Sequence, residues 1–346
     1  MIKFSRKLDI ARGNVNLAHG AGGRAATQLV NEIFYPAFAN DLLLAGNDQA
    51  TLPLSGGRLA MSTDSFVVSP LFFPGGDIGA LAVNGVINDL AMGGARPLYL
   101  SASFIIEEGF SFAKLRQIAE NMGSAARSAD VKIVTGDTKV VERGKADGIF
   151  VTTAGVGVLP DGVNLSGNRA RPGDSVMLSG SIGDHGVAVM MARQNLGFDA
   201  HVESDCAALH DLVAVMLATA GPSIRLMRDP TRGGLAATLN EIAQQSQVGF
   251  RLREADIPVK LAVAAVCELL GLDPLNVANE GKLVAVVDSD VAPALLAQMR
   301  THPLGRDAAL IGTVVEDVHR FVEMETKFGG RRIVDWLSGE QLPRIC

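Results

Sequence analysis

The chain has 346 residues, which at about 150 residues per domain predicts two domains. Hydrophobic residues make up 48% and charged residues 20% of it, a balance typical of a globular protein and not of a disordered or fibrous one. The net charge of −6 argues against a nucleic-acid backbone or an anionic membrane as the main partner. No apolar stretch reaches the ~20 residues of a membrane span, and the N-terminus lacks the apolar segment of a secretory signal, so the cytoplasm is the expected compartment.

The first half of the chain alternates strand and helix patterns. Strands are predicted over 58–63, 97–105, 131–135 and 149–159, and helices over 25–37, 78–91 and 113–129. In the last of these helices an apolar stripe at Leu115, Ile118, Ala119, Met122 and Ala126 predicts a face that packs on a core. The pattern then breaks at 160–174, whose Pro, Gly, Asn and Asp residues mark a domain boundary.

The second half repeats the mixture. It predicts strands over 175–179, 282–288 and 308–315, and helices over 186–195, 206–220, 235–246 and 261–270. A further strand pattern at 320–325 precedes a Gly-Gly turn and the tail SGEQLPRIC, whose composition predicts mobility. Two α/β layers are therefore expected, with no fixed-period repeat.

Acidic residues beside glycines or at predicted strand ends are the first candidates for chemistry. They are Asp48 in GNDQA, Asp64 in MSTDSF, Asp89 in NDLAMGG and Asp137 in VTGDTK. Neither a P-loop nor a strand-anchored G-x-G-x-x-G is present. Four such carboxylates indicate a hard cation such as Mg²⁺, although turn or cap duty remains open for any one of them.

The position of Asp89 follows from helix geometry. At 100° per residue, Asp89 falls on the same line as Ile78, Ala82 and Gly85, inside the apolar arc of the helix. A lone buried carboxylate costs several kcal/mol, so Asp89 must pair with a cation, accept hydrogen bonds or ligate a metal.

Three glycine-rich turns lead into predicted helices, at 19–25, 179–186 and 229–237. Bare backbone at a helix N-terminus can hold phosphate, and the alternative is that these glycines only turn the chain. Lys139 could neutralise phosphate or be merely solvated. Glu280, just before an apolar strand, could act as a base. The histidines lack metal-ligand spacing, which favours structural roles for His19, His185, His201 and His210.

The three cysteines show no C-x-x-C spacing. Cys206 and Cys267 lie in or beside apolar helical stretches and are predicted to be buried structural thiols. Cys346 is the last residue of the sequence, where a free thiol is a liability. We expect that it is kept for use.

Several strings in chain order carry a resemblance to one family. AHGAGG, STDSFVVSPLFFPGG, NDLAMGG, GDTKVVERG, SGSIGDHG, RDPTRGG, ANEGKLVAV and PRIC resemble the HypE hydrogenase maturation factors. These are carbamoyl dehydratases of the AIR synthase (PurM-like) ATP-dependent superfamily. The match begins near Asn16. In place of the two consecutive acids frequent in the superfamily stands Asn47-Asp48, which puts one metal contact there in doubt.

The resemblance implies an α+β/α/β, two-domain PurM-like fold. Its parts would be an N-terminal extension at 1–15, an ATP-binding and dimerisation domain at 16–160, a second domain at 170–320, and a C-terminal segment at 321–346 with the mobile tail. The implied partners are HypF as carbamoyl donor, a HypC–HypD complex as cyanide acceptor, and a second copy of the chain.

The same resemblance assigns roles. Cys346 would receive a carbamoyl group, and ATP would drive its dehydration to a thiocyanate that supplies cyanide to the [NiFe]-hydrogenase iron. Glu280 would be the base and Lys139 would offset phosphoryl charge. ATP would bind Asp48, Asp64, Asp89, Gly136, Asp137, Thr138 and Asp229. Mg²⁺ would bind the four carboxylates Asp48, Asp64, Asp89 and Asp137. Two other functions remain open, a related ATP enzyme such as selenophosphate synthetase and a non-catalytic maturation scaffold.

Overall fold

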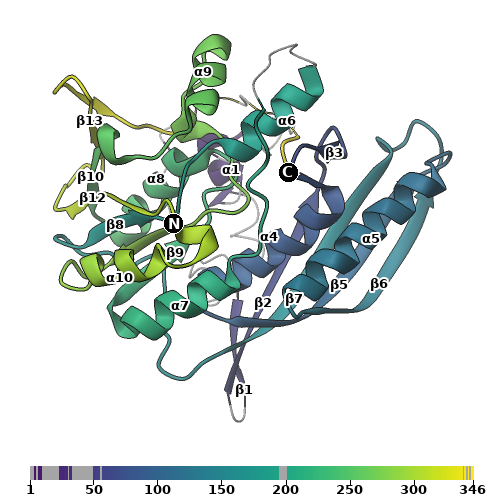
Figure 1. Cartoon of the computed structure of the whole chain (residues 1–346), viewed down its shortest axis with the longest axis horizontal. Coiled ribbons are helices and arrows are strands. Elements are labelled where there is room, and N and C mark those ends of the chain that lie inside the picture. The colour runs from purple at the N-terminus through teal and green to yellow at the C-terminus, as the bar shows by residue number, and fades with distance from the viewer. Residues whose placement is uncertain are drawn as a thin grey trace.

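Two sheets, each with its own helices, make up the part of the chain that the structure describes (Figure 1). The computed structural model describes residues 4, 7–9, 23–29, 31–32, 50–54, 57–194, 201–337, 339, 342 and 344–346. In the first domain these elements are α1 (Gly23–Leu29), β1 (Ala50–Leu54), β2 (Gly57–Phe66), β3 (Phe72–Phe73), β4 (Gly76–Asp77), α4 (Ile78–Met92), β5 (Arg96–Glu107), α5 (Phe112–Ser128), β6 (Lys132–Val141) and β7 (Ile149–Leu159).

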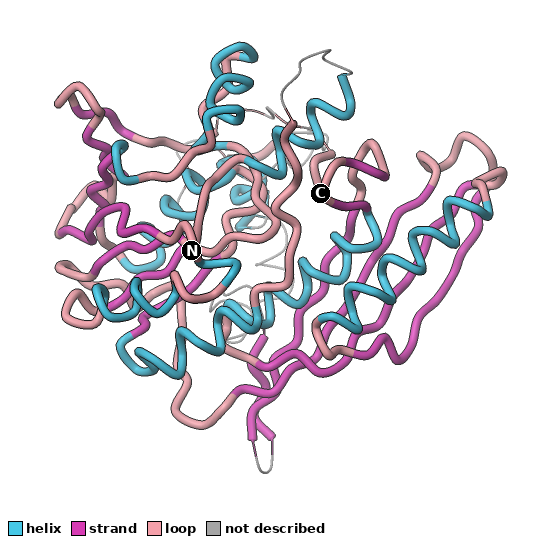
Figure 2. Tube along the Cα trace, viewed as in Figure 1, coloured by secondary structure: helices cyan, strands magenta, loops and turns pink. Residues whose placement is uncertain are grey.

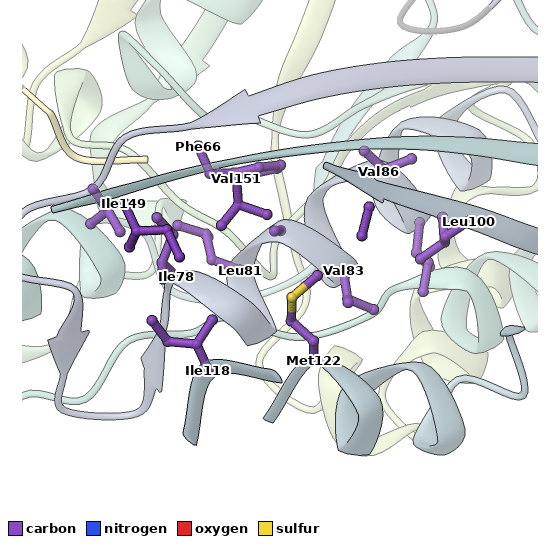
Figure 3. Close-up of a cluster of buried hydrophobic side chains, with 14 of the residues drawn as sticks. Phe66, Ile78, Leu81, Val83, Val86, Leu100, Ile118, Met122, Ile149 and Val151 are labelled. Carbon is purple, nitrogen blue, oxygen red and sulfur yellow. The ribbon is translucent and has the colours of Figure 1, made fainter. Parts of the chain in front are cut away.

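The first sheet has five strands in the order β1-β2-β7-β5-β6. Only the β5–β6 pair is parallel, and its strands run along one side of α4 and α5 (Figure 2). β7 alternates buried and half-buried residues along its whole length, because one face packs on α4. Phe66, Leu81 and Ile149 meet in this core (Figure 3). Ile118, Met122 and Ala126 bring most of the predicted α5 stripe into the core, with Leu115 packed against it, whereas Ala119 is exposed and does not belong to that face.

Among the described residues, no helix covers the opposite face of this sheet. Large apolar side chains stand on it or at its margin, including Tyr99 at 48%, Ile105 at 45% and Val134 at 58% exposure. Within the described sheet, β1 pairs only with β2 and β6 only with β5, so both are edge strands. A long, apolar edge strand is a template for pairing with another chain.

The second domain is built on a seven-stranded sheet in the order β14-β13-β10-β12-β8-β11-β9. Its elements are β8 (Ser175–Leu178), α6 (Asp184–Gln194), α7 (His210–Ala220), β9 (Ile224–Arg228), α8 (Gly234–Ser246), β10 (Gly249–Arg253), α9 (Leu261–Leu270), β11 (Val284–Val287), α10 (Ala292–Met299), β12 (Ala309–Val315), β13 (Val322–Glu325) and β14 (Arg331–Ile333).

Helices cover both faces of the second sheet. Val176 and Leu178 of β8 pack toward α8, whereas Met177 between them packs toward α7 and α10. A strand covered on both faces has no polar alternation, and all four residues of β11 are buried. The mixed α/β, two-domain fold expected from the sequence is therefore confirmed. Among the described residues, no helix has the length and apolar character needed to cross a membrane.

Among the predicted elements whose bounds differ in the structure, two bear on the site. β6 continues to Val141, because its parallel ladder with β5 extends to the Glu107–Val141 pair. The GDTK motif therefore lies inside a strand and not at its end. The helix predicted from 206 begins only at His210, because Asn88 Oδ1 accepts a hydrogen bond from Leu209 N–H and keeps the preceding segment extended. Cys206 is thus in a loop.

Candidate functional site

Four carboxylates from both domains come together where α4 meets the second domain. Asp64 lies on β2, Asp89 near the end of α4, Asp229 after β9, and Glu280 before β11. They are close enough for each to influence the others. Burial raises the pKa of Asp89 well above its usual range, and the charges of Asp229 and Asp64 raise it further. Like charges held together in this way are typical of functional sites.

Asp89 lies where the helix geometry predicted. It is on the packed side of α4, and Ser62 Oγ of β2 donates a hydrogen bond to its Oδ2. The predicted need for a hydrogen-bond partner is confirmed. Asp64, on the same strand as Ser62, accepts a hydrogen bond from Ser65 N–H at 2.8 Å. Burial also raises the pKa of Asp64, against the opposing charge of Arg232.

Arg232 is the cation of the site, and the sequence reasoning missed it. It belongs to the DPTRGG turn between β9 and α8, and its charge opposes the raised pKa values of Asp64, Asp89 and Cys346. The turn is fixed by Gly234, where a Cβ would lie 2.5 Å from Leu275 O. The signal was present in the sequence, since an arginine stood in the same glycine-rich turn as Asp229. In this turn burial, followed by the Asp64 charge, raises the pKa of Asp229 to about 6.

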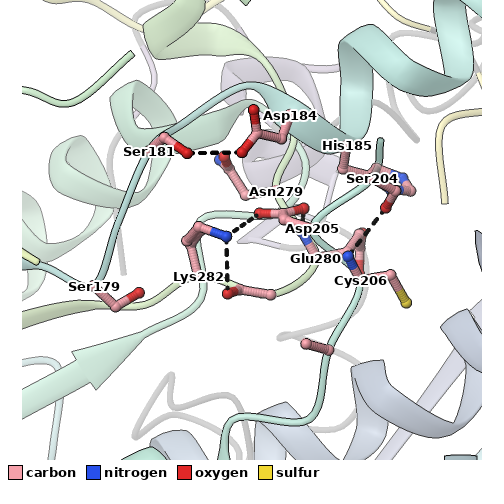
Figure 4. A network of polar contacts seen from close by, with 12 residues as sticks. Ser179, Ser181, Asp184, His185, Ser204, Asp205, Cys206, Asn279, Glu280 and Lys282 are labelled. Carbon is pink, nitrogen blue, oxygen red and sulfur yellow. Dashed lines mark hydrogen bonds and ion pairs between the residues drawn. The ribbon is translucent and has the colours of Figure 1, made fainter. Parts of the chain in front are cut away.

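Hydrogen bonds to its backbone hold Glu280 in place. Its N–H donates to Asp205 Oδ1 at 3.0 Å, and its carbonyl accepts from Asn88 Nδ2 at 3.2 Å. Lys282 Nζ pairs with Asp205 Oδ2 at 3.1 Å and completes this network (Figure 4). The Glu280 side chain is only 3% exposed. Burial, and then the charges of the neighbouring carboxylates, raise its pKa well above the usual range.

Cys346 is seated in the same place. Its backbone oxygen accepts a hydrogen bond from Val67 N–H at 3.1 Å, and the residue packs against the first core. Burial raises the pKa of the Cys346 thiol, and the Glu280 charge is the next largest cause. Figure 1 shows this end of the chain beside β3 and α6. The structure thus shows residues 344–346 docked, while mobility of the tail stays a prediction.

The GDTK motif lies elsewhere in the single chain. The register places Asp64 opposite Thr153, Thr153 opposite Ala102, and Ala102 opposite Gly136. Three strand spacings separate Asp64 from Gly136, about 14 Å. Asp137 and Lys139 are exposed and pair with each other at 2.8 Å.

Asp137 is also on the other side of the sheet. It is in register with Ser103, one residue along from buried Ala102, and adjacent residues of a strand face opposite sides. One chain therefore does not bring Asp137 or Lys139 to Asp64 and Asp89. Their assignment to ATP and metal stays a prediction that requires a second chain.

A metal site has to be tested against the residues present. Among the residues that the structure describes, no three His, Cys, Asp or Glu side chains are arranged to hold a metal ion. Asp48 and residues 19–22 of the first glycine-rich turn lie outside the described residues. Mg²⁺ is commonly held by one or two carboxylates together with substrate phosphates and waters. Asp64 and Asp89, whose mutual repulsion a cation would relieve, fit that mode.

Cys267, Cys206 and His185 have structural surroundings, whereas His201 is exposed and His19 lies outside the described residues. Cys267 is 1% exposed inside α9, as predicted. Cys206 is half-buried, and Asn84 Nδ2 donates to its Sγ at 3.4 Å. His185 is fully buried at the start of α6 and contacts the tail through Ile345 O at 2.8 Å. That contact was not foreseen.

Comparison with known proteins agrees with this geometry. The AIR synthase related protein N-terminal domain matches residues 46–159, and the AIR synthase related protein C-terminal domain matches residues 171–325. The chain is 67% identical over 346 residues to carbamoyl dehydratase HypE of Bradyrhizobium diazoefficiens, covering 100% of both chains. It is 48% identical over 338 residues to carbamoyl dehydratase HypE of Escherichia coli, covering 96% of this chain and 99% of that one.

Solved structures are similar as well. The crystal structure of hydrogenase maturation protein HypE in complex with ATP has a TM-score of 0.81 at 50% identity, covering 95% of this chain and 99% of that one. HypE in a HypE–HypF complex has a TM-score of 0.85 at 50% identity, covering 89% and 99%. The chain therefore belongs to the AIR synthase related family and, within it, to the HypE carbamoyl dehydratases.

Proposed function

We propose that this chain is an ATP-dependent carbamoyl dehydratase that acts on its own Cys346 in hydrogenase maturation. The observation that carries the proposal is the seat of Cys346, whose thiol lies within the influence of Glu280, Asp64 and Arg232. The half-buried position of Cys346 against the first core supports a reaction at the carboxylate cluster and not on the open surface. The names of the relatives support the reaction class.

The proposed reaction converts an S-carbamoyl group to an S-cyano group. ATP phosphorylates the amide oxygen, the C–O bond breaks, and ADP and phosphate leave while a C≡N bond forms. The two N–H protons must be removed. Glu280 is the proposed base, because it is buried beside Cys346 and its raised pKa makes its carboxylate a stronger proton acceptor.

The carboxylate cluster is the proposed site of ATP phosphates and Mg²⁺. Asp64, Asp89 and Asp229 would hold them, with Asp48 as a further ligand, and the HypE structure solved with ATP supports nucleotide binding. When bound, Mg²⁺ supplies stabilisation of the charge on the transferred phosphoryl group. Arg232, which the structure adds to the set, would act on the same charge.

A homodimer would complete the site. If the first sheets of two copies closed into a shared barrel, each sheet would cover the exposed apolar face and the two edge strands of the other. β6 of one copy, set against β1 of the other, would then bring the strand that holds Asp137 and Lys139 next to the sheet that holds the other copy's Asp64. Mixed dimers of Lys139→Ala and Asp89→Ala chains should then regain part of the activity that each variant alone lacks. No recovery in mixed dimers would mean that each chain works with its own Lys139.

HypF is the proposed carbamoyl donor, and the solved HypE–HypF complex supports this pairing. A HypC–HypD complex is the proposed cyanide acceptor on the strength of the family resemblance. The three free cysteines fit the reducing conditions of the cytoplasm, which is the proposed compartment.

The direct test follows the mass of the intact chain. With HypF, carbamoyl phosphate and ATP, the wild type should gain a carbamoyl adduct and then lose one water, whereas Cys346→Ala should gain none. An adduct on Cys346→Ala would show that the carrier is a different residue. Absence of nucleotide binding by the wild type would favour a non-catalytic scaffold.

A further inference from the structure

The docked tail lies along one helix of the second domain. α6 contributes two side chains to it, His185 from its first turn and Arg193 from its last. His185 Nε2 contacts Ile345 O at 2.8 Å, and Arg193 Nη2 donates to Arg344 O at 2.9 Å. The carbonyls of the two residues before Cys346 are thus both held from α6.

The hydrogen bonds of His185 fix which nitrogen carries the proton. Ile345 O can only accept, so Nε2 is the donor. Nδ1 is then the acceptor for the Ser204 hydroxyl at 2.8 Å, and Ser204 Oγ accepts from Cys206 N–H at 3.1 Å. The ring also packs edge-on against Phe73, with centroids 5.4 Å apart. This imidazole is locked in the orientation that binds the tail.

Arg193 joins the tail to the first domain. Its Nε donates to Ser69 O at 2.8 Å while its Nη2 holds Arg344 O. Ser69 N–H donates to the same Arg344 carbonyl at 3.1 Å. The planar guanidinium can bridge two carbonyls at once, which a lysine ammonium does with less geometric constraint.

We propose that His185 and Arg193 are positioning residues that form a latch on α6, holding the Cys346 tail in its docked place. The role of this latch rests on the proposed function, because the latch would keep the modified cysteine beside Glu280 during dehydration. Both side chains bind backbone carbonyls of the tail, so the latch acts through the backbone of Arg344 and Ile345. Released, the same tail would present Cys346 to a partner.

Alkylation of Cys346 by iodoacetamide measures the latch without ATP or any partner. Only the released thiol reacts quickly, so the rate reports the released fraction. In full-length protein, Arg193→Gln should raise the Cys346 rate about tenfold, and His185→Leu should do the same. Cys267, read from the same digest, should stay slow, because loss of a latch exposes only the tail whereas unfolding exposes both thiols.

Two matched variants sharpen the test. His185→Gln keeps an N–H donor in the place of Nε2 and should react near the wild-type rate. Arg300→Gln removes an arginine at the end of α10 that donates to Ala308 O, away from the tail, and should also leave the rate unchanged. If His185→Leu does not fold, Arg193→Gln decides alone.

Equal Cys346 rates for Arg193→Gln and Arg300→Gln would overturn the latch. A second readout connects the latch to chemistry: Arg193→Gln should accept the carbamoyl group at least as fast as the wild type and lose water more slowly. The latch and the proposed function can be refuted independently of each other. A wild type that never loses water from its carbamoyl adduct would refute the proposed function, and its alkylation rates would still decide the latch.

Discussion

Gly281 lies next to Glu280 where two backbone segments approach too closely for any side chain. A Cβ on Gly281 would lie 1.8 Å from Asp205 O, more than about 1.5 Å inside the optimum of ~3.5 Å for non-bonded heavy atoms. The obstacle is a backbone oxygen, which cannot rotate away. Gly281→Ala must therefore separate the two segments by over an ångström and weaken the Glu280 N–H to Asp205 bond.

The expected effect is larger on the reaction than on stability. Overpacking of this kind costs about 1–3 kcal/mol of unfolding free energy, whereas a base misplaced by ~1 Å costs about 100-fold in rate. Single-turnover loss of water from the carbamoyl adduct, followed by intact mass, measures the rate, and thermal unfolding measures stability.

Gly330→Ala is the control for this substitution. A Cβ on Gly330 would meet only Thr326 Oγ1, at 3.4 Å, so both rate and melting temperature should match the wild type. A Gly281→Ala chain that loses water at the wild-type rate would refute the placement of Glu280 as a base that Asp205 positions.

Three further predictions concern single side chains. Burial raises the pKa of Asp229 from 3.8 to about 6, so its contribution to stability is present below pH ~4 and is lost as the pH rises through about 6. Asp229→Asn should therefore gain about 1–3 kcal/mol of unfolding free energy at pH 8, where solvent screening sets the lower figure, and should gain little near pH 4. Urea titrations measure this gain, with exposed Asp161→Asn as the control. An Asp229→Asn chain that is less stable than the wild type at pH 8 would contradict the prediction. Asn88→Ala removes the hydrogen bonds to Leu209 N–H and to the Ala207 and Glu280 carbonyls and should lose about 3 kcal/mol of unfolding free energy, in contrast to exposed Asn164→Ala in the same melting assay. Glu280→Gln should still accept the carbamoyl group but lose water about 10²- to 10⁴-fold more slowly, and an unchanged rate would remove Glu280 from the mechanism.

The sequence predicts local features of this molecule well, because helix and strand periods are local properties. The position of Asp89 on the packed side of its helix followed from its angle relative to Ile78, and β7 was predicted with its observed bounds, Ile149–Leu159. The limits of β6 were not predictable in the same way. They depend on a ladder with β5, a partner whose register no local pattern specifies.

The surroundings of the site depend on residues distant in the chain. Glu280 is placed by Asp205, 75 residues away, and by Asn88, 192 residues away. Nothing near Glu280 in the sequence specifies either contact. The same applies to His185, whose lack of metal-ligand spacing favoured a structural role, although its ring binds a carbonyl 160 residues away.

Docking beside the carboxylate cluster opposes the ionisation that Cys346 needs to act as a nucleophile, and the order of the proposed steps resolves this conflict. The thiolate is the nucleophile, yet burial and the Glu280 charge raise the pKa of the Cys346 thiol in the docked tail, so docking keeps it protonated and unreactive. Accepting a carbamoyl group is therefore favoured in the released tail, where neither effect operates. Once carbamoylated, the sulfur carries no ionisable proton, and docking beside Glu280 no longer opposes ionisation. Docking of the carbamoylated tail therefore carries no ionisation cost, and it brings the modified sulfur to the cluster where dehydration is proposed to occur.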